Sequence, residues 1–148
     1  MNKILSLFFS SLLLSACATP PGQLNESDFV SRTVKIPVPV PVAVSSFYDG
    51  LRYCGPETSG LILVTAYHGI PDCSPARPDG STTCDLYLAN GLGGRSSHVL
   101  GRADFTPTPD GTRLTLRIQE YIASRTQQPS FDAWEKMARG RAKEACSK

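Results

Sequence analysis

The residues from Thr112 to Ile122 alternate between apolar and polar side chains, and this alternation limits the fold more than any other feature of the chain. Successive residues of a β-strand point to opposite faces of the sheet, so the pattern predicts a strand with one apolar face. The apolar set is Leu114, Leu116 and Ile118, and the outward set is Arg113, Thr115, Arg117 and Gln119. An apolar sheet face has to be covered, which predicts a layer of helices on one side.

Three other segments have the composition of β-strands. Leu61–His68 is apolar on both faces at its start and is predicted as a central strand. Thr83–Ala89 alternates and is predicted as a half-buried strand, and Ser96–Phe105 as a weaker one. The connections are predicted as a loop at Gly69–Thr82 and turns at Asn90–Gly94 and Thr106–Gly111.

A run of aliphatic residues and prolines, Thr33–Val44, precedes these strands. In an extended chain the aliphatic residues from Ile36 to Val44 share one face, and the three prolines share the other. Because proline lacks an N–H group, the prolines leave one edge of such a strand unable to pair. The run is therefore predicted as an edge strand, with a polyproline II segment as the alternative.

Two segments have helical patterns. Ser46–Cys54 carries Phe47 and Leu51 at helical spacing and is followed by a Gly-Pro pair, so a short helix is predicted. From Ser130 to Cys146 a single apolar stripe predicts one long C-terminal helix that begins with a capping serine. The stripe consists of Phe131, Trp134, Met137, Ala138, Ala142 and Ala145.

Together these elements predict an α+β fold. We expect one antiparallel sheet of about four to five strands, with the short N-terminal helix and the long C-terminal helix packed on one face. This order of elements is similar to the helix-grip arrangement of some outer-membrane accessory lipoproteins, including the BamC type. The resemblance is one of element order and implies a helix-grip-like domain.

The first sixteen residues have the layout of a secretory signal peptide. Lys3 gives a basic start, and the apolar and hydroxyl residues of Ile4–Leu14 follow without interruption. This run of eleven residues is too short for the hydrocarbon core, which needs about 20. Leu14-Ser15-Ala16-Cys17 resembles the lipobox of bacterial lipoproteins. The resemblance implies cleavage before Cys17 and attachment of diacylglycerol and palmitate to it, with a plain signal peptide as the alternative.

The expected organisation is therefore a cleaved signal peptide at 1–16, a lipidated flexible tether at 17–32 and a single α+β domain at 33–148. The formal net charge is only +2, without the basic footprint of a nucleic-acid-binding protein. Ala18 follows the cysteine; an aspartate there would, by resemblance to enterobacterial sorting rules, indicate inner-membrane retention. The resemblance thus implies a lipid anchor on the periplasmic face of the outer membrane.

Four further cysteines, Cys54, Cys73, Cys84 and Cys146, make an even number in an exported chain, which predicts two disulfides. Four cysteines allow three pairings. We favour Cys73–Cys84, which closes a short loop, and hence Cys54–Cys146. A zinc site is the alternative, but it needs closely spaced ligands, and no two cysteines lie nearer than eleven positions. No metal or cofactor is expected.

The two histidines, His68 and His98, are the remaining candidates for chemistry. Asp72 and Asp85 are near enough in sequence to approach His68, and a His–Asp pair can act in acid–base catalysis. A hydrolase also needs a placed nucleophile, and the sequence contains no Gly-x-Ser-x-Gly elbow. We therefore expect no enzyme, with a His68-dependent hydrolase as the weaker alternative.

The chain as a whole is also similar to small, cysteine-containing proteobacterial lipoproteins of uncharacterised function. The similarity rests on the lipobox, the Val-Pro run leading into Tyr48–Cys54, and the Phe-x-x-Trp pattern of Phe131–Trp134. The leading hypothesis is a non-enzymatic envelope binding or interaction module, with a protein partner in the envelope and no nucleic acid. The alternative is a carrier of a small hydrophobic ligand, with a pocket lined by Leu114, Leu116, Ile118 and Trp134.

Overall fold

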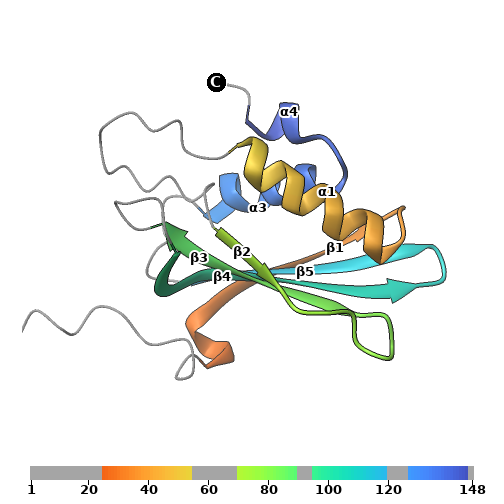
Figure 1. The fold of residues 1–148 in the computed structure, drawn as a ribbon, viewed down its shortest axis with the longest axis horizontal. Coiled ribbons are helices and arrows are strands. Elements are labelled where there is room, and N and C mark those ends of the chain that lie inside the picture. Colours follow the sequence, from red (N-terminus) through yellow and green to blue (C-terminus); the bar gives the residue numbers. More distant parts are fainter. Residues whose placement is uncertain (1–24, 55–69, 90–94, 120–126, 147–148) are drawn as a thin grey trace, which may run out of the picture.

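The computed structural model describes residues 25–54, 70–89, 95–119 and 127–146 (Figure 1). In these residues five strands form one open antiparallel sheet in the order β1-β5-β4-β3-β2. The strands are β1 (Phe29–Ile36), β2 (Ile70–Cys73), β3 (Thr82–Ala89), β4 (Arg95–Thr108) and β5 (Gly111–Gln119). The helical elements are the 3-10 turn η2 (Glu26–Asp28) and the helices α1 (Val40–Tyr53), α3 (Gln127–Ala138) and α4 (Ala142–Ala145).

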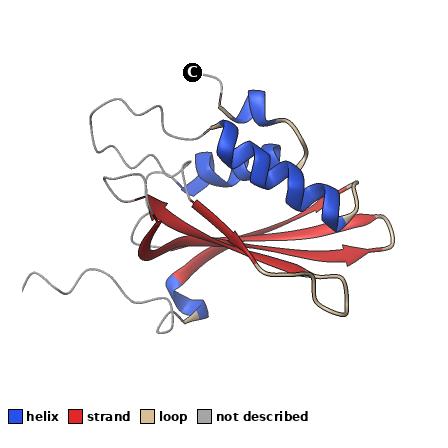
Figure 2. Cartoon of the chain, viewed as in Figure 1, coloured by secondary structure: helices blue, strands red, loops and turns tan. Residues whose placement is uncertain are grey.

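The helices α1, α3 and α4 lie on the same side of the sheet, as Figure 2 shows. The α+β class and the single antiparallel sheet with helices on one face are thus confirmed. Of the described helical elements, only the 3-10 turn η2 lies on the opposite side, next to the start of β1 (Figure 1). In the part of the chain that the structure describes, the fold therefore has two layers, and the three α-helices leave one face of the sheet, the open face, uncovered.

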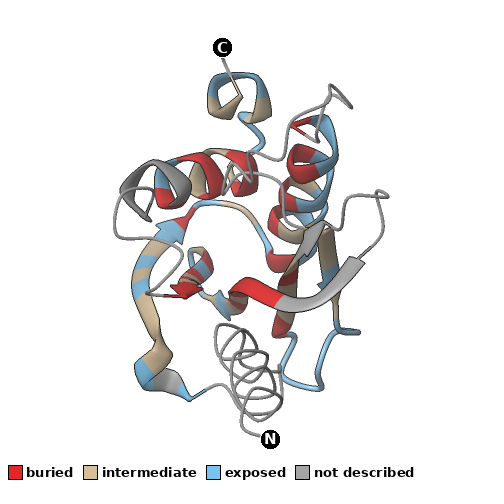
Figure 3. Cartoon of the chain, turned by 90° about the vertical axis from the view of Figure 1, so that its left-hand side faces the viewer, coloured by how far each residue is buried: buried red, intermediate tan, exposed pale blue. Residues whose placement is uncertain are grey.

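The hydrophobic core fills the space between the helices and the sheet. The ring of Phe47 on α1 packs edge-on against Phe105 of β4 and Trp134 of α3, with centroids 5.6 and 6.3 Å apart. These rings are completely buried, as are the side chains of Leu114, Leu116 and Ile118 on β5. The inward set predicted from the alternation of this strand is therefore confirmed. Figure 3 shows how the buried residues concentrate where the helices face the sheet.

The edge strand predicted over Thr33–Val44 is present only in its first four residues, and the prediction for the proline-containing part was wrong. The edge strand β1 spans Phe29–Ile36 and pairs with β5. It therefore includes residues 29–32, which the sequence predicted as the end of the tether. The prolines instead occupy the turn and the start of α1, where Pro39 is the N-cap and its carbonyl accepts the N–H of Ala43 at 3.0 Å.

The physical reason lies in the first turn of a helix. The N–H groups there have no partner within the helix, so a missing proline N–H costs nothing at that place. From Val40 onward the buried positions follow helical spacing: Val40, Ala43, Phe47, Gly50 and Leu51. The helix predicted at Ser46–Cys54 exists but begins six residues earlier than expected.

The long C-terminal helix is not present, and this prediction was also wrong. Helix α3 ends at Ala138, and Gly140 adopts a left-handed conformation with φ of 74°. The N–H of Gly140 bonds the carbonyl of Met137, and the N–H of Arg141 bonds that of Lys136. This is a Schellman motif, in which glycine ends a helix. Helix α3 begins at Gln127, so Ser130 lies inside it rather than at its N-cap, and the short α4 follows the glycine turn.

The remaining strands agree with the sequence in type and differ in extent. A strand not predicted, β2, lies within the expected loop at Gly69–Thr82 and pairs with β3. β3 begins one residue earlier than predicted, and β4 extends to Thr108. Gln119 was expected to face outward, but it is buried with 2% of its surface exposed. The predicted central strand Leu61–His68 lies outside the described residues.

Candidate functional site

The open face of the sheet carries polar and charged side chains in cross-strand rows. Strand register places Thr83, Asp104, Thr115 and Thr33 side by side on β3, β4, β5 and β1. A second row follows along the strands and consists of Asp72, Asp85, Arg102, Arg117 and Ser31. Residues directly opposite one another on a sheet face interact, so each row is a chain of neighbours.

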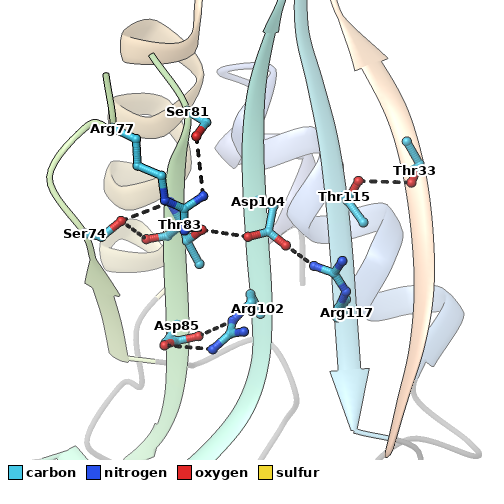
Figure 4. Close-up of polar contacts among 10 residues, drawn as sticks. All are labelled: Thr33, Ser74, Arg77, Ser81, Thr83, Asp85, Arg102, Asp104, Thr115 and Arg117. Atoms are coloured by element: carbon cyan, nitrogen blue, oxygen red, sulfur yellow. Dashed lines mark hydrogen bonds and ion pairs between the residues drawn. The ribbon is translucent and has the colours of Figure 1, made fainter. Parts of the chain in front are cut away.

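Hydrogen bonds connect the two rows (Figure 4). Asp104 accepts a bond from the Thr83 hydroxyl at 2.7 Å and forms an ion pair with Arg117. The Thr83 hydroxyl in turn accepts a bond from Nη2 of Arg77 at 3.0 Å. A continuous polar contact thus runs from the loop before β3 across β4 to β5.

A second ion pair lies beside this network. Arg102 donates from Nε and Nη2 to the two carboxylate oxygens of Asp85, at 2.7 and 3.3 Å. Such two-point pairing fixes the plane of the guanidinium group as well as its position. The Arg102 side chain remains 41% exposed, so the pair is fixed in place and still accessible from solution.

The loop between β2 and β3 positions Arg77 over this face. Asp79 accepts bonds from both the N–H and the hydroxyl of Ser81, at 2.9 and 2.7 Å, while the N–H of Arg77 bonds the Ser81 carbonyl. The hydrogen bond from the Ser81 hydroxyl is the main reason that the pKa of Asp79 is lowered, and the charge of Arg77 adds a smaller effect. The loop is therefore closed by its own hydrogen bonds.

These side chains line an open cavity of about 480 Å³. Its lining consists of Asp72, Ser74, Arg77, Thr83, Asp85, Arg102, Asp104 and Arg117. The cavity thus presents three guanidinium groups, three carboxylates and two hydroxyls. Two of the three guanidinium groups are ion-paired with carboxylates, so the cavity is suited to a polar ligand that exchanges hydrogen bonds with both kinds of group.

The two predicted cysteine pairs lie at disulfide distance. Cys54 at the end of α1 is next to Cys146 after α4, with a Cα–Cα distance of 5.6 Å. Cys73 on β2 is directly opposite Cys84 on β3. The first pair joins the two ends of the helical layer, and the second joins an edge strand to its neighbour.

The other predicted site residues are only partly within the described residues. Cys17 and His68 lie outside them, and His98 is on β4 with a side chain that is not described. Asp72 and Asp85 are in the described part, where they are opposite one another on β2 and β3. Among the described residues no group of three or more His, Cys, Asp or Glu side chains is arranged to hold a metal ion.

The sequence did not predict the open-face network as a site. Its signal was present in the outward residues of the alternating strands, such as Asp85, Thr115 and Arg117. What the alternation cannot provide is the register between strands, which decides that Asp104 meets both Thr83 and Arg117.

No protein-family model matches the chain, and no curated protein or solved structure is significantly similar to it. Within the described ranges, none of the helices combines the length and apolar character needed to cross a membrane.

Proposed function

We propose that this chain is a lipid-anchored, non-enzymatic binding module of the bacterial outer membrane, and that the open face of its sheet is the binding surface. The observation that carries this proposal is the ordered polar network on that face. Ion pairs and hydrogen bonds hold Asp85, Arg102, Asp104 and Arg117 in fixed positions around an accessible cavity. Pre-positioned polar groups bind a ligand without a large loss of conformational entropy.

The anchor in this proposal is the lipid on Cys17, after the signal peptide at 1–16. The lipobox-like Leu14-Ser15-Ala16-Cys17 supports it. Strand β1 begins at Phe29, so the chain between the lipid and the sheet has a maximum reach of about 40 Å. The domain would therefore stay close to the periplasmic leaflet, and its partner would be a component of the envelope.

The proposal includes oxidised cysteines. An exported protein reaches an oxidising compartment, where paired cysteines persist as disulfides. The placement of Cys54 beside Cys146 and of Cys73 beside Cys84 supports this.

The anchor is tested by Cys17→Ser, with membrane fractionation on a density gradient and metabolic labelling with a palmitate analogue. We expect the wild-type protein in the outer-membrane fraction with label, and the variant in the soluble fraction without label. The double variant Cys73→Ser, Cys84→Ser is the matched control, because it loses thiols and keeps the lipidation site. A Cys17→Ser protein that remains in the outer membrane would refute the anchor.

The binding surface is tested by a photoreactive amino acid in place of Thr115, at the centre of the open face. The control places the same amino acid at Ser45, which is exposed on α1 on the other side of the sheet. Irradiation of intact envelopes should give a defined adduct from position 115, and the adduct should weaken when Arg102→Gln is added. Adducts from position 45 alone would assign binding to the helical side instead.

The hydrophobic-carrier alternative receives no support from the residues named for it. Leu114, Leu116, Ile118 and Trp134 are completely buried and pack with one another in the core. Helix-grip domains hold such a ligand under a long helix, whereas α3 here ends at Ala138. The hydrolase alternative depends on His68, which is outside the described residues.

A further inference from the structure

A second cavity lies on the helical side of the molecule, between α1 and the segment that follows α3. Its volume is about 600 Å³. It is lined by Ser46, Asp49, Gly50, Tyr53, Gly140, Arg141, Ala142, Lys143 and Glu144. None of these residues belongs to the open-face network, so this cavity is a separate feature.

One wall of the cavity is a single face of α1. Ser46, Asp49, Gly50 and Tyr53 recur at the three- and four-residue spacing that places side chains on one side of a helix. The backbone of Gly50 forms part of the floor of the cavity, whereas the direction in which a side chain would point is filled by Met137 of α3. Tyr53 is 63% exposed and offers a ring face at the end of the helix.

The other wall is the short segment from Gly140 to Glu144. The left-handed conformation of Gly140 turns the chain back after α3, and none of the residues of α4 is fully buried. The pair Cys54–Cys146 joins the two walls, one residue beyond Tyr53 and two beyond Glu144. This connection holds the second wall at a fixed distance from α1.

The charged groups around the cavity are not equivalent. Arg141 and Glu144 form an ion pair with each other at 3.3 Å. Asp49 on α1 and Lys143 on α4, in contrast, have no oppositely charged partner among the described residues. The cavity therefore presents one uncompensated carboxylate on one wall and one uncompensated ammonium on the other, above a floor of Gly50 and Ala142.

We propose that this cavity binds a small zwitterion with an apolar body, of the α-amino-acid class. The Asp49 carboxylate accepts hydrogen bonds from the ligand's ammonium group, and the Lys143 ammonium donates to its carboxylate. The Tyr53 ring and the floor at Gly50 and Ala142 cover the apolar body. A mostly apolar pocket with a few placed charged groups is the usual form of a small-molecule site. The inference is independent of the anchor and of the open face.

The test uses the full lipidated chain in detergent micelles and three probes: L-leucine, leucinamide, which lacks the carboxylate, and N-acetyl-leucine, which lacks the ammonium. Titration is followed by amide NMR spectra. L-leucine should shift the resonances of residues 46–53 and 140–146 in a saturable way. Each blocked probe should bind about tenfold more weakly, because it loses one charge-assisted hydrogen bond.

Two variants connect the charges to the ligand groups. Asp49→Asn should lower the affinity for L-leucine about tenfold and leave the affinity for N-acetyl-leucine unchanged. Lys143→Met should lower the affinity for L-leucine and leave the affinity for leucinamide unchanged. Lys35→Met is the control and should bind like the wild type, because Lys35 is exposed on β1 and shares the open face with Ser31 and Thr33. Equal affinity for the three probes, shifts elsewhere in the chain, or no saturable shift with L-leucine at tens of millimolar would each overturn the proposal.

Discussion

Gly50 of α1 lies directly against Met137 of α3. A Cβ atom added to residue 50 would be only 2.7 Å from the Met137 Cβ, closer than real Cβ atoms approach one another. Glycine in a helix costs about 1 kcal/mol relative to alanine. At this position the absent side chain allows the two helices to pack closely, so packing offsets the weak helix propensity.

Gly50→Ala should therefore destabilise the protein, although alanine is the better helix former. The gain in propensity is about 1 kcal/mol, and forcing a methyl group into a filled contact costs about 1–3 kcal/mol. We expect a net loss of about 1 kcal/mol in the free energy of unfolding, measured from urea denaturation followed by circular dichroism.

Ser45→Ala is the matched control for this prediction. Ser45 is exposed on the same helix, so alanine gains propensity there without meeting Met137. This variant should be neutral or slightly more stable than the wild type. If Gly50→Ala raised the free energy of unfolding as much as Ser45→Ala does, this result would contradict the close contact of α1 and α3.

The sheet was the part of the fold that the sequence predicted best, because its strands bury one face. Leu114, Leu116 and Ile118 could be assigned to the core from alternation alone. The same argument from alternation gave a wrong result for the Val-Pro run. Its period of two suggested a strand, but three prolines in a short segment also suit a turn and a helix start, and Val40 and Phe47 fit the helical period of the buried face.

The end of α3 has a signal in the sequence, which is Gly140. The apolar stripe continues in the sequence through Ala142 and Ala145, because alanine is compatible with both buried and exposed positions, and so it predicted one uninterrupted helix. The open-face site could not be predicted at all from one strand. Its contacts, such as Asp104 with Arg117, depend on a register that only the assembled sheet defines.

The two cysteine pairs should contribute unequally to stability. Cys54 and Cys146 are 92 residues apart, and Cys73 and Cys84 are 11 apart. Loop-closure entropy gives about 4–5 kcal/mol for the longer loop and about 3 kcal/mol for the shorter one. The double variant Cys54→Ser, Cys146→Ser should therefore unfold at a lower urea concentration than Cys73→Ser, Cys84→Ser.

This comparison is made on exported protein whose thiols have been counted. The double-serine variants serve as controls for each other, because each removes two sulfur atoms and leaves the other pair. If the two double variants unfolded at the same urea concentration, or if the loss of the Cys73–Cys84 pair lowered the unfolding midpoint more, the ranking by loop-closure entropy would be contradicted.

The acid behaviour of the β2–β3 loop depends on Ser81. Its hydroxyl lowers the pKa of Asp79 below the ordinary 3.8, so Ser81→Ala should raise that pKa again. A carboxyl group with a lowered folded-state pKa stabilises the fold above its unfolded pKa, and this contribution disappears as the pH falls through the folded pKa. Ser81→Ala should thus move the loss of the loop structure to higher pH.

The measurement is an NMR titration of the Asp79 carboxyl resonance. Ser74→Ala is the control, because the Ser74 hydroxyl bonds the backbone of Thr83 and does not bond Asp79. An Asp79 pKa that is the same in Ser81→Ala and the wild type would show that the hydroxyl is not the cause of the shift.

Trp134 provides the last test, because it is completely buried and yet its indole Nε1 has no hydrogen-bond acceptor in the part of the chain that the structure describes. Trp134→Ala should lose about 3–5 kcal/mol of unfolding free energy through the cavity that it leaves. Trp134→Phe keeps most of the ring and removes the unpaired N–H, whose burial costs about 1–3 kcal/mol. The phenylalanine variant should therefore lose clearly less unfolding free energy than the alanine variant.

Tyr53→Ala replaces an exposed aromatic side chain and is the control, which should change the free energy of unfolding by less than about 0.5 kcal/mol. If phenylalanine proves as damaging as alanine at position 134, the indole N–H has a partner that stabilises the fold.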